Sequence, residues 1–247
     1  MIEVVILAGG RCGPELREAT GVDLRADIPF GDRTMLHIVR STVSHLGEPI
    51  VVGGEENGDR WRPAGANFVE SVAVGLEAVT SDSFLLVTVD VPFLTEEAVA
   101  DFLNRCDPEA GLNYPVILQE HSDTQFPGMA RTTLRTREGV FTGGNLAVVK
   151  TEAMRSAMPV LEKAYAARKS PLHLANMVGL STLGRVALGR VMPKTLTLGK
   201  LEVAVSRFLG LPVRAIQTPF ASIGADIDTA EQYLAALPLL KSQNGPI

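Results

Sequence analysis

The chain has 247 residues, of which 46% are hydrophobic, which is enough for a buried core in one or two domains and excludes general disorder. The net charge of −5 and the lack of a basic tract exclude a typical nucleic-acid-binding surface, and no apolar run approaches the roughly 18 residues of a membrane helix. The start of the chain lacks the basic region of a signal peptide, and two distant cysteines cannot make a disulfide framework, so we expect a cytoplasmic protein without a membrane partner.

Strand and helix patterns alternate through the first half of the chain. Three short apolar runs predict buried strands, at residues 4–8, 50–52 and 84–89. Apolar residues at helical spacing predict helices from about Met35 and from about Val69, and Thr95 is placed to cap a third. This alternation favours right-handed βαβ units and a mostly parallel sheet.

The second half is less regular. Further strands are predicted at 114–118, 131–135, 146–149 and 213–217, with a short extended segment at 223–227. From 151 to 210 the pattern is helical, with Pro159 expected to bend or end a helix, and Asp228 and Thr229 can cap a last helix. We therefore predict one α/β domain over 1–240, with a helical elaboration at about 151–210 and a flexible tail at 241–247.

Two glycine segments adjoin predicted strands, and ligands of open α/β sheets bind where strands end. In the first segment the backbone can approach a phosphate, and an arginine can add a charged contact; its residues are Leu7, Ala8, Gly9, Gly10 and Arg11. In the second, backbone and amide groups can contact an acceptor; its residues are Gly143, Gly144 and Asn145. The alternative for each segment is a tight turn without a ligand.

Acidic residues follow two predicted strands. Asp90 comes directly after the strand at 84–89, a position suited to holding Mg²⁺ against substrate phosphates. In an extended segment Asp226 and Asp228 point to the same side, and either could be a second carboxylate for the metal. The alternatives are a turn aspartate at Asp90 and a helix N-cap at the later pair.

Read together, these segments resemble the MobA-like NTP transferase family, the molybdenum-cofactor-guanylyltransferase-like branch of the nucleotidyltransferases. The family opens with L-A-G-G, ends its third strand in D-x-P-F-L and carries a late N/D-x-N/D-T. The corresponding residues here are Leu7-Ala8-Gly9-Gly10, Asp90-Val91-Pro92-Phe93-Leu94 and Asp226-Ile227-Asp228-Thr229. Order and spacing agree over most of 1–150 and again at 213–235. One departure is that the family's lysine is replaced by Arg25.

The resemblance implies a Rossmann-like three-layer α/β domain with a mixed, mostly parallel sheet of the nucleotide-diphospho-sugar transferase type and a helical insertion. It also implies Mg²⁺-dependent transfer of a nucleoside monophosphate from a nucleoside triphosphate to a phosphorylated or hydroxylated small molecule, with release of pyrophosphate. A homodimer is an open possibility, since dimers are the commonest oligomers.

The resemblance also implies roles for single residues. The catalytic residues would be Asp90, Arg11 and Arg25, and the metal ligands Asp90 with Asp228 and Asp226. The nucleotide would contact Leu7, Ala8, Gly9, Gly10 and Ser71, and the acceptor would contact Gly143, Gly144 and Asn145.

Two other functions remain open on the sequence alone. A nucleotide-sugar-dependent glycosyltransferase shares much of this architecture, but such enzymes usually carry D-x-D where this chain has Pro92 in the third position. A family member that binds a nucleotide without catalysis is the other alternative, motivated by the altered residues between Arg11 and Arg25. The nucleobase and the acceptor are not indicated by any pattern.

Overall fold

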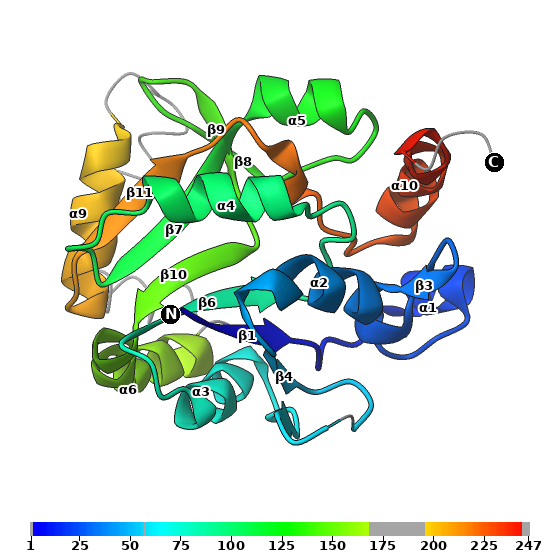
Figure 1. Cartoon of the computed structure of the whole chain (residues 1–247). Helices are drawn as coiled ribbons and strands as arrows, with labels where there is room; N and C mark the ends of the chain where they lie inside the picture. The colour runs from blue at the N-terminus through cyan, green and yellow to red at the C-terminus, as the bar shows by residue number, and fades with distance from the viewer. Residues whose placement is uncertain (1, 57, 168–195, 244–247) are drawn as a thin grey trace.

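A computed structural model describes residues 2–56, 58–167 and 196–243, and Figure 1 shows their arrangement. The central element is a nine-stranded sheet with the order β5-β4-β1-β6-β10-β7-β9-β8, in which β11 also pairs with β7. Its strands are β1 (Glu3–Leu7), β4 (Ile50–Val52), β5 (Trp61–Arg62), β6 (Ser83–Thr88), β7 (Leu112–Leu118), β8 (Thr133–Arg135), β9 (Val140–Gly143), β10 (Leu146–Lys150) and β11 (Val213–Gln217). A separate hairpin joins β2 (Pro29–Phe30) to β3 (Arg33–Thr34).

Eight α-helices accompany the sheet in the described ranges. They are α1 (Pro14–Thr20), α2 (Met35–Val43), α3 (Phe68–Ala78), α4 (Glu96–Arg105), α5 (Gln119–Gln125), α6 (Thr151–Ala167), α9 (Leu198–Leu209) and α10 (Ala230–Gln243). Side-chain oxygens cap several of them, as expected for Thr95, which accepts a hydrogen bond from the N–H of Ala98, and for Thr229, which accepts one from Gln232. None of these helices is both long and apolar enough to cross a lipid bilayer.

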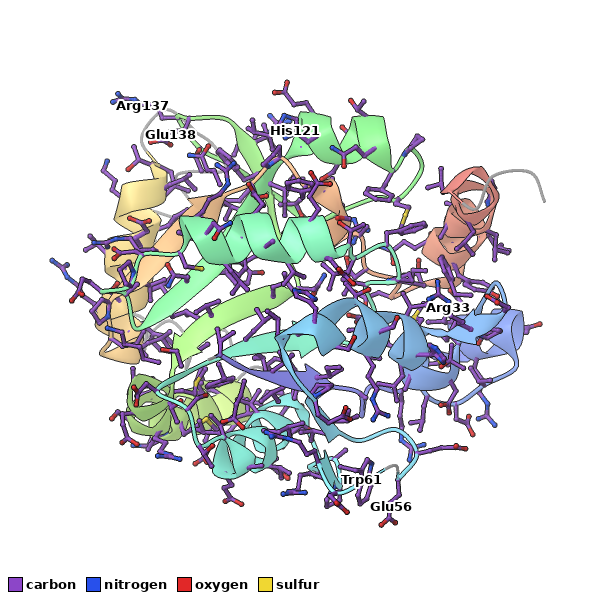
Figure 2. The ribbon with its side chains drawn as sticks, viewed as in Figure 1. Arg33, Glu56, Trp61, His121, Arg137 and Glu138 are labelled. Atoms are coloured by element: carbon purple, nitrogen blue, oxygen red, sulfur yellow. The ribbon has the colours of Figure 1, made fainter. Side chains whose placement is uncertain are left out.

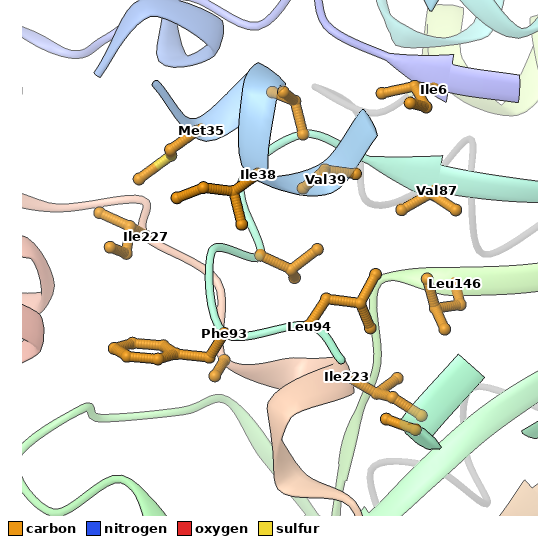
Figure 3. Close-up of a cluster of buried hydrophobic side chains, with 14 of the residues drawn as sticks. Ile6, Met35, Ile38, Val39, Val87, Phe93, Leu94, Leu146, Ile223 and Ile227 are labelled. Carbon is orange, nitrogen blue, oxygen red and sulfur yellow. The ribbon is translucent and has the colours of Figure 1, made fainter. Parts of the chain in front are cut away.

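The side chains of β1 alternate between two cores, and this creates the layers. Val4 and Ile6 pack with α2 and α4, whereas Val5 and Leu7 pack with α3 and α6. Figure 3 shows part of the first core, where α2 places Ile38 and Val39 close to the sheet. The expected three-layer α/β architecture is therefore confirmed.

Most strands point the same way, with two exceptions. β1 pairs in parallel with β4 and β6, but β10 lies between β6 and β7 and is antiparallel to both. β9 is antiparallel to β7 and β8. The sheet is thus mixed and mostly parallel, as expected, and the reversed β10 brings its start to the carboxyl end of β6.

Two local expectations need correction, and some strands are additional to those predicted. The segment expected to be extended at 223–227 begins as a 3-10 turn, η4 (Ala221–Gly224), because the carbonyl of Ile223 accepts a hydrogen bond from the N–H of Asn145 and the turn packs against 143–145. Strand β9 was not expected. Pro159 does not end α6, which continues to Ala167; the proline and Arg155, whose carbonyl loses its helical donor, are both exposed residues.

The described ranges cover only part of the helical elaboration predicted at 151–210 and of the tail predicted at 241–247. Helices α6 and α9 lie within 151–210, as the helical pattern indicates, but residues 168–195 lie outside the described ranges. Helix α10 runs to Gln243, past Leu240, where the tail was expected to begin.

Candidate functional site

A cavity of about 670 Å³ lies at the carboxyl ends of β1, β4 and β6. The loop after β1 and the start of α3 form much of its wall. Most of the residues expected to act on a nucleotide line it: Leu7, Gly9, Gly10, Arg11, Arg25, Ser71 and Asp90. A separate cavity of about 560 Å³ beside α2 contains none of these residues.

The glycine loop after β1 offers free backbone donors. In the described structure, no hydrogen bond uses the N–H of Gly9 or of Gly10. A Cβ on Gly9 would lie 2.5 Å from the Cβ of Ala64, so the loop also requires glycine for packing. The expectation for Ala8 is less well met, because its N–H already donates to the carbonyl of Val52 at 2.8 Å and the residue does not line the cavity.

The segment carrying Arg25 runs alongside this loop. The N–H of Cys12 donates to the carbonyl of Asp23 at 2.8 Å, and the N–H of Arg25 donates to the carbonyl of Gly10 at 2.9 Å. A Cβ on Gly10 would lie 3.5 Å from Cδ of Arg25, so the arginine side chain crosses directly over the glycine. The short helix η1 (Arg25–Asp27) follows. These contacts fix the start of the Arg25 side chain.

Arg25 joins two of the predicted carboxylates. Its Nη1 lies 2.8 Å from Oδ2 of Asp90 and 2.5 Å from Oδ1 of Asp228. The other oxygen of Asp90 accepts a hydrogen bond from the hydroxyl of Thr88 at 2.6 Å. The structure therefore brings Asp90 and Asp228 together across one guanidinium nitrogen, although they are far apart in the sequence.

Ile227 explains why the late acidic segment reaches Asp90. Its side chain is fully buried, and Figure 3 shows it in the core near Met35. Its N–H donates to the carbonyl of Asp90 at 2.9 Å. The anchored Ile227 thus holds the segment of Asp226 and Asp228 against the end of β6.

Asp226 pairs with a residue that the sequence analysis did not identify. It forms an ion pair with Arg131, whose side chain is only 7% exposed. Burial lowers the pKa of Arg131 to about 10, although the charges of Asp228 and Asp90 act to raise it. Those charges place Arg131 in the same acidic centre. No motif marks this residue; the only sequence signal is the pair of apolar residues before it, Phe126 and Met129, which anchor its loop in the core.

These pairings separate the three candidate metal ligands. Asp90 and Asp228 converge on one cationic nitrogen, and carboxylate oxygens are the donors that Mg²⁺ prefers. Asp226 is engaged by the buried Arg131. Within the described ranges, no group of three or more acidic, histidine or cysteine side chains is arranged to hold a metal. The residues therefore fit an ion held by two carboxylates and completed by ligand oxygens, which is common for Mg²⁺.

The expected acceptor residues lie beside this centre but do not line the cavity. The carbonyl of Asn145 accepts a hydrogen bond from the N–H of Thr88 at 3.1 Å, which places the turn next to the end of β6. The N–H of Gly144 donates to the carbonyl of Pro115, and a Cβ on Gly144 would lie 2.6 Å from Cγ2 of Ile223. This close contact leaves no room for a side chain at Gly144, as is typical of a tight turn, the alternative to an acceptor site.

The far end of the cavity is formed by the segment before α3. Ser71 is buried, and its hydroxyl accepts a hydrogen bond from the N–H of Gly65 at 3.1 Å, so it shapes the loop. The indole N–H of Trp61 donates to the carbonyl of Gly53 at 3.1 Å and ties this loop to the end of β4. Figure 2 shows Trp61 at one edge of the molecule, with His121 and Arg137 at the opposite edge.

Comparison with solved structures agrees with this architecture. A hypothetical transferase from Thermus thermophilus is 35% identical, with a TM-score of 0.81, over 94% of this chain and 99% of that one. A 2-C-methyl-D-erythritol 4-phosphate cytidylyltransferase, also from Thermus thermophilus, is 20% identical, with a TM-score of 0.55, over 97% and 98% of the two chains. A nucleotidyl transferase from Methanothermobacter thermautotroptrophicus is 15% identical, with a TM-score of 0.55, over 99% of each. At 20% and 15% identity, the last two comparisons show a shared fold and no more.

The family model for the MobA-like NTP transferase domain matches residues 4–170. No protein of curated function matches the chain. The matched range contains two of the motifs that carry the resemblance, the glycine loop and the segment from Asp90, whereas the late motif at Asp226 to Thr229 lies beyond it. The chain belongs to the MobA-like NTP transferase family.

Proposed function

We propose that this protein transfers a nucleoside monophosphate from a nucleoside triphosphate to a phosphorylated or hydroxylated small molecule and releases pyrophosphate. The observation that carries the proposal is one cavity in which free N–H groups of Gly9 and Gly10 lie beside Arg25 and Asp90. Backbone donors and a guanidinium bind phosphate oxygens well, and an adjacent carboxylate pair can hold a cation.

The charge of the centre supports a requirement for a divalent cation. Three carboxylates, Asp90, Asp226 and Asp228, face two guanidiniums, Arg25 and Arg131. Apart from Arg11, which is exposed and screened by water, the centre therefore has an excess of negative charge before any phosphate arrives. A triphosphate would be repelled unless additional positive charge came with it.

We assign Mg²⁺ to Asp90 and Asp228, and not to Asp226, whose carboxylate is paired with Arg131. When bound, the ion neutralises phosphate charge and stabilises the charge that develops during phosphoryl transfer. Loss of Asp90 would then cost at least about 10²-fold in rate, by analogy with the loss of one major electrostatic stabiliser.

The chain itself contributes mainly orientation and charge. The N–H groups of Gly9 and Gly10 bind and orient phosphate oxygens, and Arg25 and the exposed Arg11 contribute positive charge. The turn at Gly143, Gly144 and Asn145 borders the other side of Asp90, which suits an acceptor whose oxygen attacks the α-phosphorus in line.

The test is a thermal-shift panel with ATP, GTP, CTP, UTP and nucleotide sugars, each with and without Mg²⁺. A ligand at about 100 times its dissociation constant stabilises by about 2.7 kcal/mol, or roughly 5–10 °C at this size. We expect a Mg²⁺-dependent shift with at least one triphosphate in the wild type. It should be weakened in Asp90→Asn and retained in Asp123→Asn, a change at an exposed position on α5.

Other outcomes would contradict the proposal in different ways. A shift with nucleotide sugars alone would favour glycosyl transfer. A triphosphate that binds the wild type but releases no pyrophosphate with any plausible acceptor would favour a binding protein without catalysis. No shift with any nucleotide would remove the nucleotide site itself.

A further inference from the structure

We infer that Arg25 makes the acidic centre selective for a divalent cation that arrives on a nucleotide and excludes the free cation. The inference rests on the proposed function and concerns the order in which the same site is filled. It starts from the observation that the space between Asp90 and Asp228 already contains a positive charge.

The geometry of Arg25 is that of an internal counter-ion. A single nitrogen, Nη1, contacts both carboxylates, at 2.8 Å and 2.5 Å. The arginine side chain is 24% exposed, and that of Asp90 is 12% exposed, so water screens their pairing only partly. A free Mg²⁺ ion would have to displace this nitrogen in order to take its place between the two carboxylates.

Displacement by a free ion is unfavourable because Arg25 has no other described acceptor. Its Nε is buried and has no hydrogen-bond partner among the described residues. Its backbone N–H donates to the carbonyl of Gly10 and its side chain crosses that glycine, so the guanidinium stays within reach of the carboxylates and of the loop after β1. The free ion would therefore meet a fixed positive charge.

A nucleotide changes this balance because it brings acceptors for the same guanidinium. Phosphate oxygens bound by Gly9 and Gly10 would lie beside the Arg25 side chain, which crosses over Gly10. A guanidinium pairs with phosphate through two parallel hydrogen bonds. Arg25 can then exchange its carboxylate partners for phosphate and leave Asp90 and Asp228 to the cation. Binding of cation and nucleotide should consequently be mutually reinforcing, since coupling between two ligands is reciprocal.

Binding of Mn²⁺, followed by electron paramagnetic resonance of the free ion, tests this directly and needs no turnover. The wild type alone should bind Mn²⁺ weakly. When it is saturated with an α,β-methylene triphosphate analogue, its affinity for Mn²⁺ should exceed the affinity of the free analogue for Mn²⁺ at least about tenfold. In the absence of nucleotide, Arg25→Gln should bind Mn²⁺ at least about tenfold more tightly than the wild type, a difference of about 1.4 kcal/mol. Arg25→Lys, which keeps a charge there, should show a smaller gain.

Two controls separate this effect from others. Arg17→Gln removes the same charge from an exposed pair with Asp23 and should leave Mn²⁺ binding unchanged. Adding Asp90→Asn to Arg25→Gln should abolish the gain. Equal Mn²⁺ affinity in Arg25→Gln and the wild type would overturn the inference, as would tight binding of Mn²⁺ to the nucleotide-free wild type that depends on Asp90.

Failure of the proposed function would look different. In that case Arg25→Gln would bind Mn²⁺ tightly, but no triphosphate analogue would affect the wild type. If Arg25→Gln does not fold by circular dichroism, the smaller gain expected for Arg25→Lys takes its place, and tight, Asp90-dependent binding of Mn²⁺ to the nucleotide-free wild type still overturns the inference.

Discussion

The two sides of Asp90 are built in different ways. On one side, the cavity residues follow β1, β4 and β6, three strands that pair in parallel and carry their loops to one edge. On the other side, Arg131, Asn145 and Asp228 come from a loop, a turn and a segment after η4. The first side depends on local strand-to-loop geometry, whereas the second depends on long-range pairings such as that between Arg131 and Asp226. Mutations on the two sides should therefore differ in what they disturb.

The largest expected effect on stability lies on the second side. Asp226→Ala leaves the buried Arg131 without its partner, and removal of one member of a buried ion pair costs about 3 to 5 kcal/mol. Urea denaturation should show this loss, and Asp32→Ala, at an exposed position, should show almost none. A loss below about 1 kcal/mol in Asp226→Ala would mean that this side does not depend on the pair.

The strands that lead to the first side are anchored at their opposite ends by Glu3, at the start of β1, and this anchor should depend on pH. Burial raises the pKa of Glu3, but the ion pair with Arg60 and hydrogen bonds from the N–H groups of Thr80 and Ser81 outweigh it and hold the pKa at about 2, below the usual 4.5. Because the folded-state pKa is lowered, this stabilisation is present above pH 4.5 and is lost as the pH falls towards 2.

The pH dependence can be isolated with Glu3→Gln. We expect the variant to be about 2 to 3 kcal/mol less stable than the wild type at pH 7, with the difference shrinking as the pH falls below 4.5. Urea midpoints of both proteins across this range give the measurement. If the stability difference between the two proteins were the same at the highest and the lowest pH, Glu3 would not act through its charge.

Gly9→Ala tests the local packing of the first side. The new Cβ would lie 2.5 Å from the Cβ of Ala64, an overlap that should cost about 2 kcal/mol and displace the free N–H groups of the loop. We expect both a lower melting temperature and a weaker nucleotide shift. Gly13→Ala is the matched control, because its Cβ would have no neighbour within 4 Å. If a nucleotide raised the melting temperature of both variants equally, the role given to Gly9 would be contradicted.

The smallest effects on stability are expected at two helix caps, Thr95 at the start of α4 and Thr229 at the start of α10. Thr95→Ala and Thr229→Ala each remove one capping hydrogen bond and should each cost about 1 kcal/mol. They should differ in ligand binding, because Thr229 lies beside Asp228 and begins the helix whose Gln232 holds the carbonyl of Ala130. Only Thr229→Ala should reduce the Mg²⁺-dependent shift. If both variants respond to ligand like the wild type, α10 does not position the acidic segment.

The difference between the two sides of Asp90 also explains which parts of the site could be predicted from the sequence. Leu7, Gly9, Gly10 and Asp90 could be predicted to lie near a ligand because each stands at or just after the end of a strand that the apolar pattern marks clearly. The pattern could not show that the Ala8 N–H is used by Val52, since that depends on which strand lies beside β1.

On the second side, the missing information is tertiary. Arg131 lies before β8 with no motif around it, and its partner is distant in the sequence. Alternation predicts that Asp226 and Asp228 point to the same side, yet each meets a different arginine. The choice between them depends on where the loop of Arg131 is carried, which local spacing does not contain.

Trp61 gives this site a built-in optical signal. It is the single tryptophan of the chain, it lines the cavity, and its indole N–H is fixed to the carbonyl of Gly53. All intrinsic tryptophan emission therefore originates at the wall of the proposed nucleotide site, without background from other indoles. Occupancy of the cavity can be followed in the unmodified protein by fluorescence, in real time and with any nucleotide, before an acceptor is known.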